Sequence, residues 1–144
     1  MPSVMRNINT ICRSASMYRA QNSSDNRPGI YHSYIFVIKN HPGLSQDKLA
    51  KALCVNKSNV TRHVTFLEGN GYIERQPGKD KREMLIFPTE KLLSAYPEVH
   101  DISKKWYSLI SESLSADELE FLEKTLQKLA EKAAGIIYSA EDDQ

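Results

Sequence analysis

Residues 45–71, SQDKLAKALCVNKSNVTRHVTFLEGNG, contain the pattern that decides the fold. Ser45 is a suitable N-cap for a short helix over residues 46–53, because its hydroxyl can accept a hydrogen bond from a free amide of the first turn. Asn56 can cap a second helix that runs to about Glu68, and the glycines that follow end it. A short helix, a three-residue connector and a second helix are the parts of a helix-turn-helix.

The second helix has one apolar face and one polar face. Val60, Val64 and Leu67 are spaced i, i+4, i+7 and are expected to pack onto a core. The other face carries side chains that suit a DNA groove, since Arg can bond guanine bidentately, Asn can bond adenine, and Ser or Thr can bond base edges or phosphates. With the capping residue Ser45, the candidate DNA-contacting residues here are Lys57, Ser58, Asn59, Thr61, Arg62 and Thr65.

A β-hairpin is predicted directly after the second helix. Residues 72–75 and 83–87 have the composition of short strands, and Pro, Gly and charged residues lie between them. An isolated turn of this kind would more simply be a solvated loop. Beside a recognition helix, however, a basic loop can reach the adjacent minor groove, whose negative potential attracts arginine. We therefore predict a wing, with candidate DNA-contacting residues Arg75, Lys79, Asp80, Lys81 and Arg82.

Helices are predicted before and after this winged lobe. Residues 4–20 and 30–40 carry apolar side chains at helical spacing. Thr89 can cap a further helix, in which Pro97 predicts a kink or a restart. Ser115 opens a capping box before a last helix, whose apolar stripe is Leu119, Leu122, Leu126 and Leu129. The predicted fold class is thus mainly α with a small β-hairpin wing.

The net charge of +1 conceals an uneven distribution. Residues 1–43 hold five Lys/Arg and one Asp/Glu, residues 44–91 hold nine and six, and residues 92–144 hold five and eleven. The first two segments are therefore basic and the last is acidic. A basic surface favours a polyanionic partner, although solvated helices also differ in charge by chance.

Several classes of protein are excluded by the sequence. Two cysteines are too few for a disulfide framework, and no apolar run approaches the ~20 residues that cross a bilayer. The first residues contain no apolar stretch typical of a signal peptide, so a cytoplasmic protein is expected. We find no phosphate loop, nucleophile elbow or paired carboxylates, and the four histidines are scattered. An enzyme, a metal site and a cofactor are therefore not predicted.

Six segments of the chain together resemble the MarR (multiple antibiotic resistance regulator) family. The strongest is LE-x-x-G-Y-I-x-R at residues 67–75, followed by the D-x-R of residues 80–82. The order and spacing of the segments resemble the family over most of residues 30–134. The other segments are residues 43–50, 56–62, 89–91 and 114–119.

The resemblance implies a transcriptional regulator, more often a repressor, that binds double-stranded DNA as a homodimer. It places an N-terminal dimerisation helix and loop at residues 1–28, a winged helix-turn-helix lobe at 29–91 and C-terminal dimerisation helices at 92–144. The two recognition helices would enter successive major grooves of a pseudo-palindromic operator. In this family Arg82 would enter the minor groove and Asp80 would hold the wing by ion pairing.

Release from DNA by a small ligand or a stress signal is also implied. Relatives bind small aromatic acids between their lobes, where Tyr18, Tyr31 and Tyr34 would lie, although aromatic residues at helical spacing more often pack in a core. Cys12 lies near the position of the reactive cysteine in peroxide-sensing members, so a thiol-based redox regulator is an alternative function. The other interpretation of Cys12 is an ordinary residue of the helix without a redox role. A winged-helix module for protein interaction, without a DNA target, is a further alternative.

Some positions depart from the family pattern, among them Pro88, where leucine is usual, and Pro97. Cys54 stands where glycine is common, which bears on the turn of the helix-turn-helix. His63 stands where an apolar residue is usual, and Phe66 where a polar one is usual. The last two positions bear on which operator sequence is read.

Overall fold

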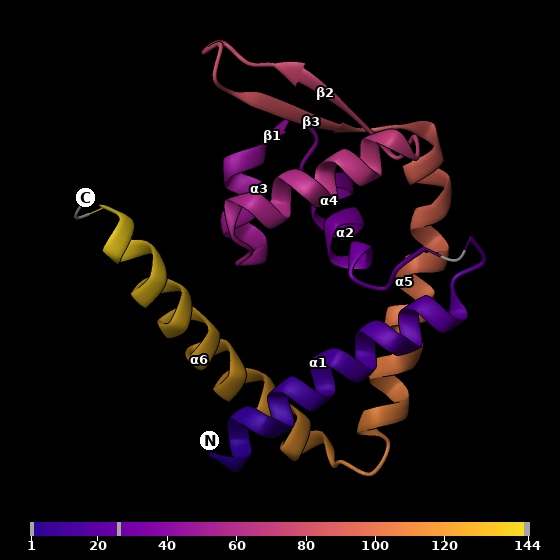
Figure 1. The fold of residues 1–144 in the computed structure, drawn as a ribbon. Coiled ribbons are helices and arrows are strands. Elements are labelled where there is room, and N and C mark those ends of the chain that lie inside the picture. Colours follow the sequence, from indigo (N-terminus) through magenta and orange to yellow (C-terminus); the bar gives the residue numbers. More distant parts are fainter. Residues whose placement is uncertain (1, 26, 143–144) are drawn as a thin grey trace. The chain divides into compact units, whose positions relative to one another are not determined.

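The computed structural model describes the backbone of residues 2–25 and 27–142, and side chains up to residue 139. The chain divides into two compact units, Met1–Trp106 and Tyr107–Gln144. The elements in chain order are α1 (Ser3–Asn22), α2 (Tyr31–Asn40), β1 (Leu44–Ser45), α3 (Gln46–Leu53), α4 (Lys57–Gly69), β2 (Ile73–Pro77), β3 (Met84–Pro88), α5 (Glu90–Ser111) and α6 (Ala116–Asp142) (Figure 1). The mainly helical fold class with a small wing is confirmed.

The two helices of the predicted helix-turn-helix, α3 and α4, begin at the predicted caps. The hydroxyl of Ser45 accepts a hydrogen bond from the backbone amide of Lys48, at 3.2 Å. The side-chain oxygen of Asn56 accepts one from the amide of Asn59, at 2.8 Å. Each cap satisfies an amide that has no partner within its own helix, which fixes where the helix starts.

Cys54 forms the turn between α3 and α4 in a left-handed backbone conformation. Its φ is +53° and its ψ is 44°, and it is the one non-glycine residue with positive φ in the described part of the chain. Its amide donates to the carbonyl of Lys51, and the amide of Val55 donates to the carbonyl of Ala50. The turn thus keeps a glycine-like backbone although its residue is a cysteine, at a cost of roughly 1–2 kcal/mol.

The wing is part of a three-stranded antiparallel sheet in the order β1-β3-β2. β2 and β3 form the predicted hairpin, with Ile73 opposite Pro88 and Pro77 opposite Met84. β1 adds only two residues to the other edge of β3, where Leu44 lies opposite Ile86. The sequence did not predict β1, because two residues are too few to show an alternating pattern.

The core of the first unit lies between the helix-turn-helix, α2, the sheet and the start of α5. The predicted inward residues of α4 (Val60, Val64 and Leu67) are buried there, which confirms the assignment of its apolar face. They pack with residues that come from every neighbouring element, namely Ile35, Ile38, Leu49, Ile86, Leu92 and Val99. Burial of these side chains places the opposite face of α4 in solvent.

A buried arginine holds the loop between α1 and α2. The side chain of Arg27 is only 1% exposed, and its Nε lies 3.3 Å from Oδ1 of Asp25. Its Nη2 lies 3.9 Å from a carboxylate oxygen of Glu98 in α5. The hydroxyl of Tyr72, at the base of the wing, donates to Asp25, and the ring of Tyr72 lies under the guanidinium. We call Asp25, Arg27, Tyr72 and Glu98 the polar network; it joins the loop, the wing base and α5.

Ionisation follows from this arrangement. Burial opposes the charge of Asp25, but the hydrogen bond from Tyr72 and the positive charge of Arg27 outweigh it and lower the pKa of Asp25. Burial, and then the hydrogen bond to Asp25, raise the pKa of Tyr72 to about 12. The network therefore contains a charged carboxylate and a neutral phenol over the physiological range of pH.

The polar network is next to a second buried group, His32 of α2. Its Nε2 lies 3.0 Å from the hydroxyl oxygen of Ser23. Burial, and then the positive charges of Arg27 and Arg19, lower the pKa of His32 to about 4. His32 is therefore neutral in the folded protein near pH 7.

α5 and α6 follow the wing. The structure has one helix through Pro97, so the predicted restart is wrong; Leu92 and Val99 are buried on either side of the proline, and their packing holds the helix together. The predicted capping box of α6 is confirmed, with reciprocal hydrogen bonds of 2.8 and 3.1 Å between Ser115 and Glu118. None of the helices in the described part of the chain has the length and apolar character needed to cross a bilayer.

Substitution of Cys54 tests the left-handed turn. We expect Cys54→Gly to raise the free energy of unfolding by up to about 1 kcal/mol, because glycine adopts positive φ without strain. We expect Cys54→Val to lower it by about 1 kcal/mol or more, because a β-branched side chain is disfavoured there. Equilibrium urea unfolding measures both changes, and a valine variant as stable as the glycine variant would contradict this account.

Acidification tests the neutral state of His32. The unfolded chain binds a proton at His32 near pH 6.5, whereas the folded chain binds it only near pH 4. The folded protein therefore keeps its full stability above about pH 6.5. Its free energy of unfolding falls by up to about 3 kcal/mol as the pH falls toward about 4. In urea unfolding, His32→Gln should flatten the profile between pH 7 and pH 5. Parallel profiles for wild type and His32→Gln would assign the effect to another group.

Candidate nucleic-acid interface

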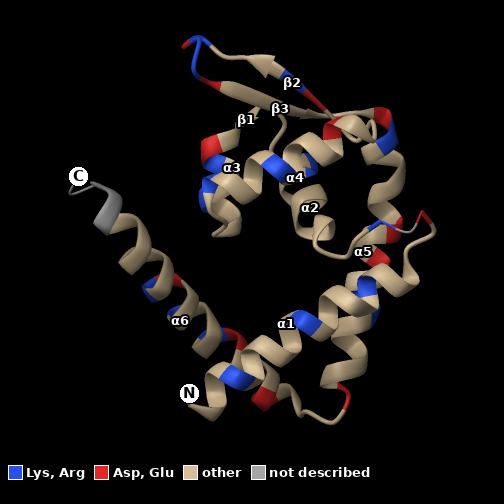
Figure 2. Cartoon of the chain, in the orientation of Figure 1, with Lys and Arg blue, Asp and Glu red and all other residues tan. Residues whose placement is uncertain are grey.

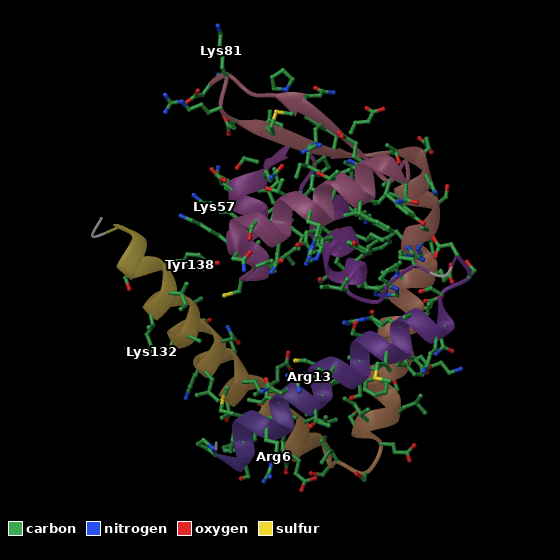
Figure 3. All side chains as sticks on the ribbon, in the orientation of Figure 1. Arg6, Arg13, Lys57, Lys81, Lys132 and Tyr138 are labelled. Atoms are coloured by element: carbon green, nitrogen blue, oxygen red, sulfur yellow. The ribbon has the colours of Figure 1, made fainter. Side chains whose placement is uncertain are left out.

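All the predicted groove residues except Ser45 lie on α4, and most of them are on its solvent face. Asn59 is half-buried, Ser45 is buried as the cap of α3, and the others are exposed, namely Lys57, Ser58, Thr61, Arg62 and Thr65. Figure 2 shows that Lys and Arg residues occur on α3, on α4 and at the tip of the wing. In Figure 3 the side chain of Lys57 extends outward near the start of α4, and that of Lys81 extends outward from the wing. The sequence-predicted residues are thus brought to two neighbouring sites of one unit.

Hydrogen bonds orient the polar side chains of α4. Nη2 of Arg62 donates to the side-chain oxygen of Asn59, one turn earlier, at 2.9 Å. The hydroxyl of Thr61 donates to a backbone carbonyl of its own helix and accepts from the side-chain amide of Gln46 in α3, at 3.1 Å. Gln46 was not among the predicted site residues, and only its place at the start of the preceding helix could have indicated it. Arg62 is therefore pre-ordered beside Asn59 rather than free to rotate.

The tip of the wing is shaped by backbone hydrogen bonds. A side-chain oxygen of Asp80 accepts from the backbone amide of Arg82, at 3.1 Å. The amide of Glu83 donates to the carbonyl of Asp80, and the amide of Gly78 donates to the carbonyl of Glu83. Asp80 therefore holds the turn through the backbone of Arg82; the expected side-chain ion pair between them is not among those found in the described residues. The exposed cationic residues of the tip are Lys79, Lys81 and Arg82.

Arg75 has a partner within the protein. Its Nε and Nη2 donate to the two carboxylate oxygens of Glu68, at 3.0 and 2.9 Å. This hydrogen bonding lowers the pKa of Glu68 and raises that of Arg75. The pair joins the end of α4 to β2, so Arg75 fixes the wing relative to α4. A contact between Arg75 and DNA stays a prediction.

The three predicted ligand-binding tyrosines belong to two separate aromatic contacts. Tyr18 packs against Trp106, with ring centroids 5.0 Å apart. Tyr31 and Tyr34 are both buried in α2 and face α4, where Tyr31 stacks on Phe66 and Tyr34 bonds to His63. The sequence missed this second role, because the partners are about 30 residues apart in the chain.

Cys12 and the histidines complete the predicted sites. Cys12 is an exposed free thiol on α1. Over the described residues, no three His, Cys, Asp or Glu side chains gather as a metal site would require.

Comparison with known proteins places this geometry in a family. The model of the MarR family matches residues 32–84. The HTH-type transcriptional regulator BilQ of Clostridium symbiosum (strain WAL-14163) is 32% identical over 97 residues, which are 67% of each chain.

Solved structures agree with the fold over nearly the whole chain. A MarR protein from Peptoclostridium difficile has a TM-score of 0.90 at 20% identity, covering 96% of this chain and 92% of that chain. A putative MarR family transcriptional regulator from Listeria monocytogenes, complexed with a 26mer DNA, has a TM-score of 0.83 at 25% identity, covering 99% and 96%. With its helix-turn-helix, wing and capped last helix, the chain belongs to the MarR family of transcriptional regulators.

Proposed function

We propose that this regulator binds double-stranded DNA in a sequence-specific way through α4 and the wing. The observation that carries the proposal is the pair of the exposed Arg62 and the half-buried Asn59, held together by a hydrogen bond on a helix whose other face is buried. A major groove about 12 Å wide admits a helix, and these two side-chain types discriminate guanine and adenine. The Listeria regulator of the same fold was solved with DNA, which supports the proposal.

Phosphate contacts would position the protein on the duplex. The exposed Lys57 lies in the first turn of α4, where backbone amides that lack helical partners also attract anions. The cationic tip of the wing extends away from the lobe and would reach the adjacent minor groove (Figure 2). Arg62 and Asn59 would then supply base preference, and the lysines and Arg82 would supply most of the salt-dependent affinity.

We also propose that the protein is a homodimer, with residues 1–28 and 92–144 supplying the contacts. Large apolar side chains are exposed on both terminal helices; Met17 of α1 is 61% exposed and Phe121 of α6 is 73% exposed. Apolar surface of this extent is rare on monomers and favours a partner. Further exposed members are Val4, Met5 and Ile11 on α1, and Leu122, Leu126, Leu129, Ile136 and Ile137 on α6.

Two copies would present two recognition helices and so read a pseudo-palindromic operator. Their spacing would match successive major grooves, about 34–36 Å apart. A dimer placed over both grooves would exclude other proteins from that stretch of duplex, which favours repression. A small ligand or a stress signal that changes the spacing would release the DNA. Tyr31 and Tyr34 support this proposal, because any signal that moves α2 acts directly on α4.

Two arginine substitutions test the DNA-binding surface. We expect Arg82→Ala to weaken binding to all duplexes alike and to reduce the salt slope by about 1. We expect Arg62→Ala to cost about 1–3 kcal/mol on the preferred sequence and to change base preference. Fluorescence anisotropy over a range of salt measures both, with Lys124→Ala on α6 as the control for loss of a cation. Wild-type binding at low salt by both variants would contradict the proposed surface.

The oligomeric state tests the apolar face of α6. Light scattering should give twice the chain mass of 16.4 kDa. We expect Leu129→Glu to shift the protein toward monomer, because it puts a charge into an apolar contact, and to weaken binding to a two-site operator. The neighbouring exposed Lys128→Glu should remain dimeric. A monomeric wild-type protein would overturn the proposed homodimer.

A further inference from the structure

The recognition helix is fastened to α2 by an aromatic cluster that contains one histidine, with three buried members and the exposed Phe66 at its edge. Tyr31 and Tyr34 of α2 and His63 and Phe66 of α4 form this aromatic cluster. Nδ1 of His63 lies 2.7 Å from the hydroxyl oxygen of Tyr34, and His63 is 6% exposed. The imidazole meets the rings of Tyr31 and Tyr34 edge-on, at 5.5 and 5.3 Å between centroids. The ring of Phe66 stacks on Tyr31, at 4.4 Å.

We propose that His63 is a positioning residue for DNA recognition, and that only its neutral form, hydrogen-bonded to Tyr34, holds α4 in the orientation that reads bases. This inference rests on the proposed DNA-binding function and deepens it. It adds an anchor on the buried side of α4 and a dependence of sequence discrimination on pH.

The helix geometry gives this anchor its effect. Successive residues of an α-helix are about 100° apart around the axis, so the direction of His63 sets that of its neighbour Arg62. Asn59 lies one turn earlier and is hydrogen-bonded to Arg62. The valines and the leucine of α4 also pack inward, but apolar contact is non-directional and tolerates small rotations of the helix. The hydrogen bond of His63 with Tyr34 is directional, and it restricts that rotation.

The hydrogen bond depends on the protonation state of His63. We assign His63 the neutral tautomer that carries its ring proton on Nε2, in which Nδ1 accepts the hydroxyl proton of Tyr34. Burial raises the pKa of Tyr34 to about 12, so its hydroxyl keeps its proton to donate. Once His63 is protonated, Nδ1 becomes a donor, and the hydroxyl must turn so that its oxygen accepts. Protonation therefore reverses the bond that anchors α4.

The surroundings disfavour the charged ring. The titratable or charged groups that face His63 in the described residues are Tyr31 and Tyr34 from α2 and Arg62 from its own helix. Burial, and then the positive charge of Arg62, lower the pKa of His63 below its usual value of about 6.5. As the pH falls through that range, proton binding favours arrangements that expose the ring, and these are arrangements in which α4 has moved from α2.

The experiment measures sequence discrimination at two pH values. Affinity is compared for a duplex selected from a randomised library and for a scrambled duplex, at about pH 7.5 and about pH 5.5 and constant ionic strength. The variants are Tyr34→Phe, which removes only the hydroxyl, and His63→Asn, whose amide oxygen can replace Nδ1 as acceptor without titrating. His41→Asn, at an exposed histidine just after α2, is the matched control.

We expect the wild-type ratio of selected to scrambled affinity to fall on acidification, and the same fall for His41→Asn. His63→Asn should abolish that pH dependence. Tyr34→Phe should lower the ratio about fivefold at the higher pH, with the affinity for the scrambled duplex unchanged, as expected for loss of one hydrogen bond. NMR titration of the His63 ring in the free wild-type protein should give a pKa below 6.5.

The outcomes separate this inference from the proposed function. A wild-type protein that binds DNA with a pH-independent ratio, or a His63→Asn variant that keeps the pH dependence, would overturn the inference alone. Absence of salt-sensitive binding to any duplex would overturn the DNA-binding proposal and this inference with it. Should Tyr34→Phe unfold, as circular dichroism would show, the His63→Asn profile and the wild-type NMR titration still decide.

Discussion

Burial of one face of α4 is the constraint on which the rest of the structure depends. Val60, Val64 and Leu67 can leave water only if α2, α3 and the sheet close around them. When they do, the polar residues of the same helix have no place except the surface. The turn at Cys54, the two N-caps and the ion pair of Glu68 with Arg75 then restrict where α4 starts and how the wing leaves it. Core formation and presentation of the polar face of α4 are thus one event.

Local patterns predicted most of this architecture. The caps Ser45 and Asn56, the capping box at Ser115 and the hairpin were all found, because each depends on residues within a few positions of one another. The two-residue β1 could not be predicted, because its pairing with β3 joins residues about 40 positions apart. Of the kink and the restart predicted at Pro97, the restart was wrong, because intrinsic propensity carries no information on the packing that keeps α5 continuous.

The candidate site was predictable in composition but not in its connections. The alternation of inward and outward positions along α4 was enough to list its exposed polar residues. The partners of those residues were not predictable. Gln46 donates a hydrogen bond to Thr61 from another helix, and Glu68 forms an ion pair with Arg75 across a turn. Tyr34 and His63 each look like ordinary residues of an amphipathic helix, and only the crossing of α2 and α4 makes them a pair.

The polar network around Arg27 also has a consequence for how the protein can be divided. Its members come from residues 25–27, 72 and 98, so a fragment cut at residues 29 and 91 would keep Tyr72 but lose Asp25, Arg27 and Glu98. The smallest piece that keeps this polar network should therefore start before residue 25 and extend past residue 98. Swapping this lobe between homologues would succeed only if the incoming segment carried its own guanidinium and carboxylates with it.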